Sequence, residues 1–205
     1  IEMGRENKGI RISFNSPVIL IFSIASLLVL GLGYMTGGVS ERLLFCVYRS
    51  SLSDPLTYFR FFGHVLGHAN WEHFISNIMM ILVVGPLLEE KYGSTDTLFV
   101  ILTTAFVTGL IHFIFFPNVA LLGASGIVFA FILLASMTSI EDGKIPLTFI
   151  LVAVIYIGGQ IRDGILVKDD VSNLTHIIGG IVGSVFGFAM NKYRAVSYTH
   201  LTLPT

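Results

Sequence analysis

The sequence predicts an all-α membrane protein: a bundle of six transmembrane helices with a membrane-associated first loop. Hydrophobic residues make up 54% of the 205 residues, charged residues only 12%, and the mean hydropathy is +0.82, unlike a soluble domain. The apolar residues fall into six stretches, the first of which has the roughly 20 residues needed to cross a bilayer. The later connections are short, which favours antiparallel neighbours in one domain, residues 17–192.

The first stretch, residues 17–36, is apolar throughout, and basic residues precede but do not follow it, which predicts a spanning helix. A cleaved signal peptide is the alternative, disfavoured because the apolar core is long and more hydrophobic segments follow. Residues 1–16 form a polar segment that we expect to be cytoplasmic. Because the chain begins with Ile1 rather than Met, we expect the natural start to lie upstream.

Residues 37–71 form the longest connection, and it is amphipathic. Aromatic residues such as Tyr58 and Phe62 alternate with Arg42, Arg49 and Arg60, a composition typical of a segment in the membrane interface. Cys46 is the single cysteine of the chain. It cannot form an intrachain disulfide, and we interpret it as inert.

Five further helices are expected at residues 72–89, 97–116, 125–140, 145–162 and 172–190. Lys192 and Arg194 provide a basic end to the last helix. The residues after them lack both periodicity and charge, so we interpret residues 193–205 as a tail outside the fold.

The distribution of Lys and Arg predicts a cytoplasmic N-terminus, which places residues 37–71 outside. The cytoplasmic side would then carry seven basic residues (Arg5, Lys8, Arg11, Lys91, Lys144, Lys192, Arg194) and the outer side five (Arg42, Arg49, Arg60, Arg162, Lys168). Three predicted helices therefore begin at the outer face. The net charge of −1 and the absence of a basic run exclude nucleic acid as an expected partner.

Ser125 lies between small residues at the start of an apolar helix. The first backbone N–H groups of a helix have no partner within it and can stabilise a developing oxyanion. This arrangement suits the nucleophile of an acyl transfer. The alternative is a patch of small residues that lets two membrane helices pack closely.

Four polar residues fall at one predicted depth near the outer face: His73, Asn77, Ser125 and His176. Polar groups inside a membrane are costly and often mark function, although a single histidine also occurs as a hydrogen-bonded packing residue. Because His73 and Asn77 are four residues apart, both lie on one face of their helix. We expect them to donate toward a common point.

A stripe of glycines follows His176 and allows its helix to approach another closely. Gly179 and Gly183 would pack against Gly126 and Ala130, which would bring His176 within hydrogen-bond reach of Ser125. The uncharged loop at residues 117–124 predicts that Ser125 lies below the membrane surface, in a cavity that water enters from outside.

These motifs resemble those of the rhomboid family of intramembrane serine proteases. Gly123-Ala124-Ser125-Gly126 is similar to the family's Gly-x-Ser-Gly, with Ser125 as nucleophile. His176, followed by Gly179 and Gly183, is similar to its general base. The resemblance covers roughly residues 15–192 and implies the six-helix rhomboid fold.

Further positions carry the resemblance. The pair His73-xxx-Asn77 resembles the family's His-xxx-Asn, which implies that both complete an oxyanion hole with the Ser125 N–H. His64 and His68 match histidines that tie the first loop to the second helix. Phe59-Arg60 stands where Trp-Arg is usual. Phe129 stands where many members have a Tyr against the base, so it keeps the ring and loses the hydroxyl. The helix at 145–162 is implied to be the lateral gate.

The resemblance implies a serine endopeptidase that cleaves peptide bonds in or near transmembrane helices, through an acyl-enzyme and a Ser125–His176 dyad. It needs no cofactor or metal. Its partners would be transmembrane substrates and the bilayer. The expected location is a cell membrane, with the active site facing the extracytoplasmic side. The lack of extra domains suits a bacterial plasma membrane.

Two other function classes remain open. A zinc protease could use His64, His68 and His73, but the chain has no His-Glu-x-x-His motif and no placed general base. A rhomboid-like binder, chaperone or transporter of membrane segments would be expected to lack Ser125 or His176, and both are present.

Overall fold

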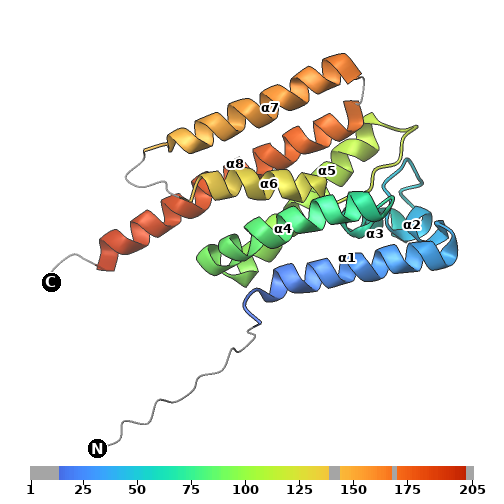
Figure 1. Cartoon of the computed structure of the whole chain (residues 1–205), viewed down its shortest axis with the longest axis horizontal. Coiled ribbons are helices and arrows are strands. Elements are labelled where there is room, and N and C mark those ends of the chain that lie inside the picture. Colours follow the sequence, from blue (N-terminus) through green and yellow to red (C-terminus); the bar gives the residue numbers. More distant parts are fainter. Residues whose placement is uncertain (1–13, 139–143, 168–169, 202–205) are drawn as a thin grey trace, which may run out of the picture.

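The structure is a computed structural model that describes residues 14–138, 144–167 and 170–201. Its long helices lie side by side in one bundle (Figure 1). Long, apolar helices that can cross a membrane are α1 (Pro17–Thr36), α4 (Trp71–Tyr92), α5 (Ser94–Phe115) and, within α8 (Asp170–Leu201), the stretch Asn173–Asn191. The chain is therefore a multi-pass membrane protein with at least these four candidate spans.

The first helix, α1, has the bounds that the sequence predicts. Pro17 occupies its first position and Gly37 ends it in a left-handed conformation, with φ 62°. The carboxylate of Glu89, near the end of α4, accepts hydrogen bonds from the backbone N–H of Val18 at 3.0 Å and of Ile19 at 3.1 Å. Glu89 is buried, so these bonds supply partners for N–H groups that a helix cannot pair internally.

The first loop, residues 37–71, is more ordered than the sequence indicates. It contains α2 (Val39–Leu44), α3 (Pro55–Gly63) and the 3₁₀ helix η1 (His64–Leu66). The side chain of Asp54 caps α3 by accepting a hydrogen bond from the Leu56 N–H at 3.0 Å. Cys46 is buried in this loop, and burial raises the pKa of its thiol to about 11, so the thiol stays protonated at neutral pH.

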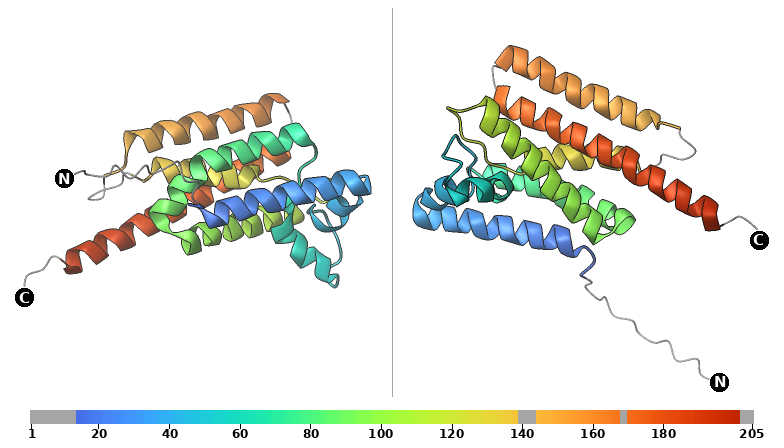
Figure 2. Two further views of the ribbon diagram at one scale, coloured as in Figure 1. Left: turned by 60° about the horizontal axis from the view of Figure 1, so that its bottom comes forward. Right: turned by 180° about the vertical axis from the view of Figure 1, so that it is seen from behind.

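The central helix, α6 (Ser125–Ser136), begins at the predicted residue. Its twelve residues extend about 18 Å, well short of a hydrocarbon core of about 30 Å. It contacts α4, α5, α8 and α7 (Leu147–Val167), so Ile127, Ala130 and Phe131 are almost wholly buried. Helix α7 lies at the edge of the bundle away from α1 (Figures 1 and 2).

The last helix differs most from its prediction. Helix α8 begins at Asp170 and continues to Leu201, eleven residues beyond the predicted end at 190. The backbone of residues 193–201 is thus helical. The predicted segment 1–16 is described only from residue 14, and residues 139–140 of the predicted fourth helix and 202–205 of the predicted tail lie outside the described residues.

Candidate active site

Ser125 is the first residue of α6. The carbonyl of Ala124, just before it, accepts hydrogen bonds from Ile127 N–H at 2.9 Å and Val128 N–H at 3.0 Å, which closes the first turn. Gly123 has φ 126°, a conformation that residues with a side chain rarely adopt. The sharp entry and the helix start leave the first N–H groups of α6 beside the Ser125 hydroxyl.

The backbone leading to Ser125 is hydrogen-bonded to the first loop. Val47 and Leu121 exchange two antiparallel backbone hydrogen bonds, each 2.9 Å long. The Gly123 N–H donates to the carbonyl of His64 at 2.9 Å. We call these three bonds the loop seam. They fix the backbone before Ser125 and satisfy polar groups that lie away from water.

His73 and Asn77 lie on α4 beside the same backbone. A Cβ atom on Gly123 would lie 2.7 Å from Cε1 and 2.9 Å from Nε2 of His73, so the imidazole packs directly against this glycine. Asn77 is 6% exposed, and its Nδ2 donates to the His73 carbonyl at 3.0 Å. The amide nitrogen carries two N–H donors, and this bond uses one of them.

The His176 imidazole, on α8, stacks on the ring of Phe129, with centroids 4.2 Å apart and planes 11° from parallel. Phe129 is one turn after Ser125 and shares its face of α6, so the stack brings His176 near the start of α6.

Helices α6 and α8 run parallel with their backbones in contact. A Cβ on Gly179 would lie 2.9 Å from the carbonyl carbon and 3.0 Å from Cα of Gly126. A Cβ on Gly183 would lie 2.7 Å from Cα of Ala130. The glycine spacing predicts this packing, which sets the position of His176 along α6.

Two buried histidines connect the first loop to the site. His68 lies edge-on to His73, with ring centroids 5.2 Å apart, so it faces α4 as the resemblance implies. His64 instead faces α5: its Nε2 is 3.4 Å from Thr108 Oγ1, and its Nδ1 is 3.2 Å from the Arg60 carbonyl. Burial lowers the pKa of both imidazoles to about 4, so both are neutral at neutral pH.

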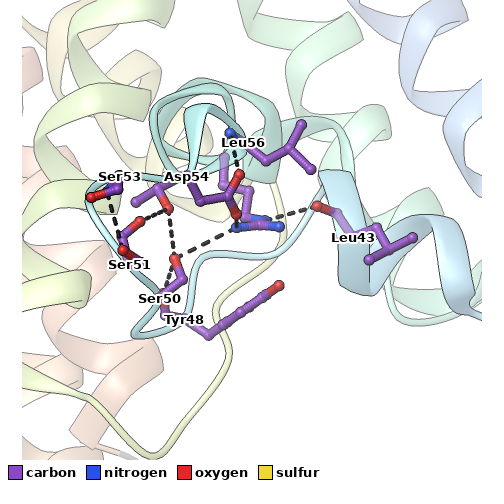
Figure 3. A network of polar contacts seen from close by, with 9 residues as sticks. Leu43, Tyr48, Ser50, Ser51, Ser53, Asp54 and Leu56 are labelled. Carbon is purple, nitrogen blue, oxygen red and sulfur yellow. Dashed lines mark hydrogen bonds and ion pairs between the residues drawn. The ribbon is translucent and has the colours of Figure 1, made fainter.

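Arg60 is buried and holds the first loop together from inside. Figure 3 shows Leu43, Tyr48 and Asp54 gathered around this network of polar contacts. The Arg60 Nε donates to the Leu43 carbonyl at 2.7 Å, and its Nη1 lies 3.3 Å from Asp54 Oδ2. The guanidinium also sits over the Tyr48 ring, 4.7 Å from its centroid. Phe59, which precedes it, packs edge-on to Phe45 and is 47% exposed. Arg60 therefore serves the shape of the loop and does not contact Ser125.

The sequence interpretation missed His112, on α5. Its Nε2 donates to the Val119 carbonyl at 2.8 Å, and its ring stacks on Phe116. His112 is 2% exposed, and this bond ties the loop before Ser125 to α5. A histidine within an apolar helix is itself a signal, and the same depth argument that selected His176 could have found it.

Comparison with known proteins places these residues in one family. A family model described as the Rhomboid domain matches residues 55–193. The chain is similar to Rhomboid-related protein 1 of Caenorhabditis elegans, 29% identical over 68% of this chain and 41% of that protein. It is also similar to Rhomboid-related protein 2 of Mus musculus, 30% identical over 68% of this chain and 53% of that protein.

A third relative, Rhomboid protease GlpG of Haemophilus influenzae, is 25% identical over 66% of this chain and 71% of that protein. The chain thus spans about half the length of the first relatives that it matches, and more of the third. The matched region includes the first loop from Pro55 onward, which carries Arg60, all of α4 and α6, and the part of α8 that carries His176. The chain belongs to the rhomboid family.

Proposed function

We propose that this chain is an intramembrane serine endopeptidase that hydrolyses peptide bonds in or near the transmembrane helices of other proteins. The observation that carries the proposal is the junction of α6 and α8. There, Ser125 of the Gly-x-Ser-Gly motif is the first residue of the buried helix α6, one turn before Phe129, on which His176 stacks. Family membership and a relative named as a rhomboid protease support the same reaction class.

In the proposed reaction, Ser125 Oγ attacks the carbonyl carbon of the scissile bond while His176 accepts the hydroxyl proton. The tetrahedral intermediate carries the negative charge on its oxygen. His176 then donates its proton to the departing amine as the C–N bond breaks, which leaves an ester on Ser125. Water attacks this ester with His176 again as base, and the carboxylic acid leaves with Ser125 restored.

Three groups are proposed to stabilise the oxyanion: the Ser125 N–H and the side chains of His73 and Asn77. The contact of His73 with Gly123 supports this assignment because it holds the imidazole beside the turn that precedes Ser125. Gly126, Gly179 and Gly183 would act through packing, and Phe129 would orient the base through the ring stack.

We further propose that the chain crosses the membrane six times, with both termini cytoplasmic and the site facing the extracytoplasmic side of a bacterial plasma membrane. The short α6 supports a site below the surface, because it cannot reach across the bilayer. Transmembrane substrates would enter beside α7. Among the described helices, α7 packs extensively against α6 and α8 alone, so fewer neighbours hold it in place.

The test is covalent labelling and turnover with the full chain in lipid vesicles. A fluorophosphonate probe should label the wild type and the control Ser136→Ala, at the other end of α6, but not Ser125→Ala. His176→Ala should also lose turnover of a transmembrane substrate. Asn77→Ala should keep activity reduced by roughly 10²–10³ in kcat, the effect of one lost oxyanion donor.

Full turnover by folded Ser125→Ala would overturn the mechanism. Full turnover by folded His176→Ala would remove the dyad and spare the serine. Absence of labelling and turnover in the wild type would favour a rhomboid-like protein that binds transmembrane helices without cleaving them.

A further inference from the structure

Helices α1 and α5 leave an open slot between them. A cavity of about 380 Å³ lies there, and all of its lining residues are apolar. We call it the α1–α5 slot and define it by Ile21, Ala25, Phe59, Phe62, Leu98 and Leu102, which contribute its walls and roof. The slot is separate from Ser125 and from the residues proposed to act with it.

The first loop explains why the slot exists. Helix α1 packs mainly against α4 and also contacts α2 and η1, and the ribbon views place α2 at its C-terminal end (Figures 1 and 2). Because η1 contacts both α1 and α5 and α3 packs on α5, the loop forms a wedge between α1 and α5 over part of their length, and the two helices touch directly over only a short stretch. Beyond the wedge, toward the N-terminal ends of both helices, the lining reaches Val18 and Leu98.

The roof of the slot is held by ring contacts. Phe62 stacks on Phe106 of α5, with centroids 5.5 Å apart and planes 23° from parallel, while Phe59 packs edge-on to Phe45. Both roof residues are more than 40% exposed in the isolated chain. Ile21 and Leu102, on the two walls, are 61% and 41% exposed. The slot therefore opens sideways, out of the bundle.

The surroundings decide what can occupy it. Both walls belong to candidate membrane spans, so the medium outside the opening is lipid hydrocarbon. Water is disfavoured because a buried water needs two to four polar partners, and the lining supplies apolar side chains.

We propose that the α1–α5 slot binds one acyl chain of a bilayer phospholipid, drawn from the leaflet at the N-terminal end of α1. The chain enters where Val18 and Leu98 line the opening and ends beneath Phe59 and Phe62. The acyl chain supplies dispersion contacts that the lining side chains would lack if the slot were empty. It also supports the underside of the first loop, and this inference does not depend on the proposed protease activity.

The test is lipid retention by the full chain after reconstitution into palmitoyl-oleoyl-phosphatidylcholine vesicles and re-extraction in detergent, read by native mass spectrometry. The variants Ala25→Trp and Leu102→Trp fill the slot from opposite walls. The control Ile24→Trp adds the same ring one residue away, at a 54% exposed position that does not line the slot. Circular dichroism and size-exclusion chromatography verify that each variant folds. If one of the two filling variants does not fold, the other alone provides the test.

We expect one phospholipid per chain in the wild type and in Ile24→Trp. Both filling variants should retain at least about tenfold less, the change expected when roughly two methylenes lose their burial. A wild type without retained phospholipid would overturn the proposal. So would filling variants that retain as much as Ile24→Trp, because the lipid would then bind elsewhere.

Discussion

Replacing Gly179 by alanine tests whether close packing of α6 and α8 assembles the site. The added Cβ would lie 2.9–3.0 Å from backbone carbons of Gly126 and in still closer contact with its carbonyl oxygen. Carbon atoms pack best at about 3.5–4.0 Å, so the two helices must separate by roughly 0.5–1 Å. Backbone atoms cannot swing away as a flexible side chain could.

The neighbouring Gly180 provides a matched control. A Cβ there would lie 3.7 Å from Leu133 Cδ2, an ordinary van der Waals contact. Gly180→Ala should therefore keep activity and gain up to about 0.5–1 kcal/mol from helix propensity. Gly179→Ala should lose about 1–3 kcal/mol from overpacking. Its turnover should fall about 10²-fold, because catalytic groups displaced by about 1 Å lose that much.

Turnover of a transmembrane substrate in vesicles and thermal unfolding in detergent measure the two effects. The reasoning fails if Gly179→Ala matches Gly180→Ala in both melting temperature and turnover. A stability loss without a turnover loss would show that the contact holds the bundle but does not position His176.

Three further expectations follow from other contacts. Glu89→Ala removes the acceptor of two α1 backbone N–H groups and of the Ser94 hydroxyl, so it should lower the free energy of unfolding, measured by thermal unfolding, by about 3 kcal/mol or more. The control Glu90→Ala changes an exposed neighbour and should lower it by less than about 0.5 kcal/mol. Equal losses in the two variants would contradict the capping role of Glu89. Burial lowers the pKa of His64 to about 4, so below about pH 6.5 the unfolded chain binds more protons than the folded chain, and the free energy of unfolding falls as pH drops toward 4. The melting temperature of His64→Gln should therefore fall less steeply with decreasing pH than that of the wild type. Parallel curves of melting temperature against pH for the two proteins would refute this. For topology, Ser53→Cys should react with an impermeant maleimide from outside the cell while buried Cys46 stays unlabelled, and labelling from the cytoplasmic side alone would invert the orientation.

The sequence predicts the structural features that are set by residues close together in the chain, such as helix ends and the packing face of a helix. Pro17 and Gly37 set the ends of α1, and the small residues before Ser125 mark the start of α6. The spacing of Gly179 and Gly183 predicts which face of α8 approaches another helix, because small residues recur every turn. These signals lie within a few residues of the structure that they determine, so they can be read from one segment.

Other features depend on which distant segments meet. Glu89 caps a helix some 70 residues earlier in the chain, and no local pattern identifies a buried glutamate as a cap. The Val47–Leu121 pair and the His112 bond to Val119 likewise join segments whose proximity follows from packing. The short helices α2 and α3 were missed because brief helices carry little periodicity. Helix α8 exceeds its prediction because the residues after Arg194 contain no proline or glycine before Pro204 to end it.

The loop seam has a consequence for hydrogen exchange. Its three donors, the amides of Val47, Leu121 and Gly123, lie outside the helices, where amide protons usually exchange quickly with solvent. Here each is hydrogen-bonded at 2.9 Å, and Val47 and Leu121 are buried. Breaking one bond exposes partners of the others, so the first loop and the backbone before Ser125 should open as one cooperative unit. Their exchange rates should then be slow, similar to one another, and equally sensitive to any change that loosens either loop.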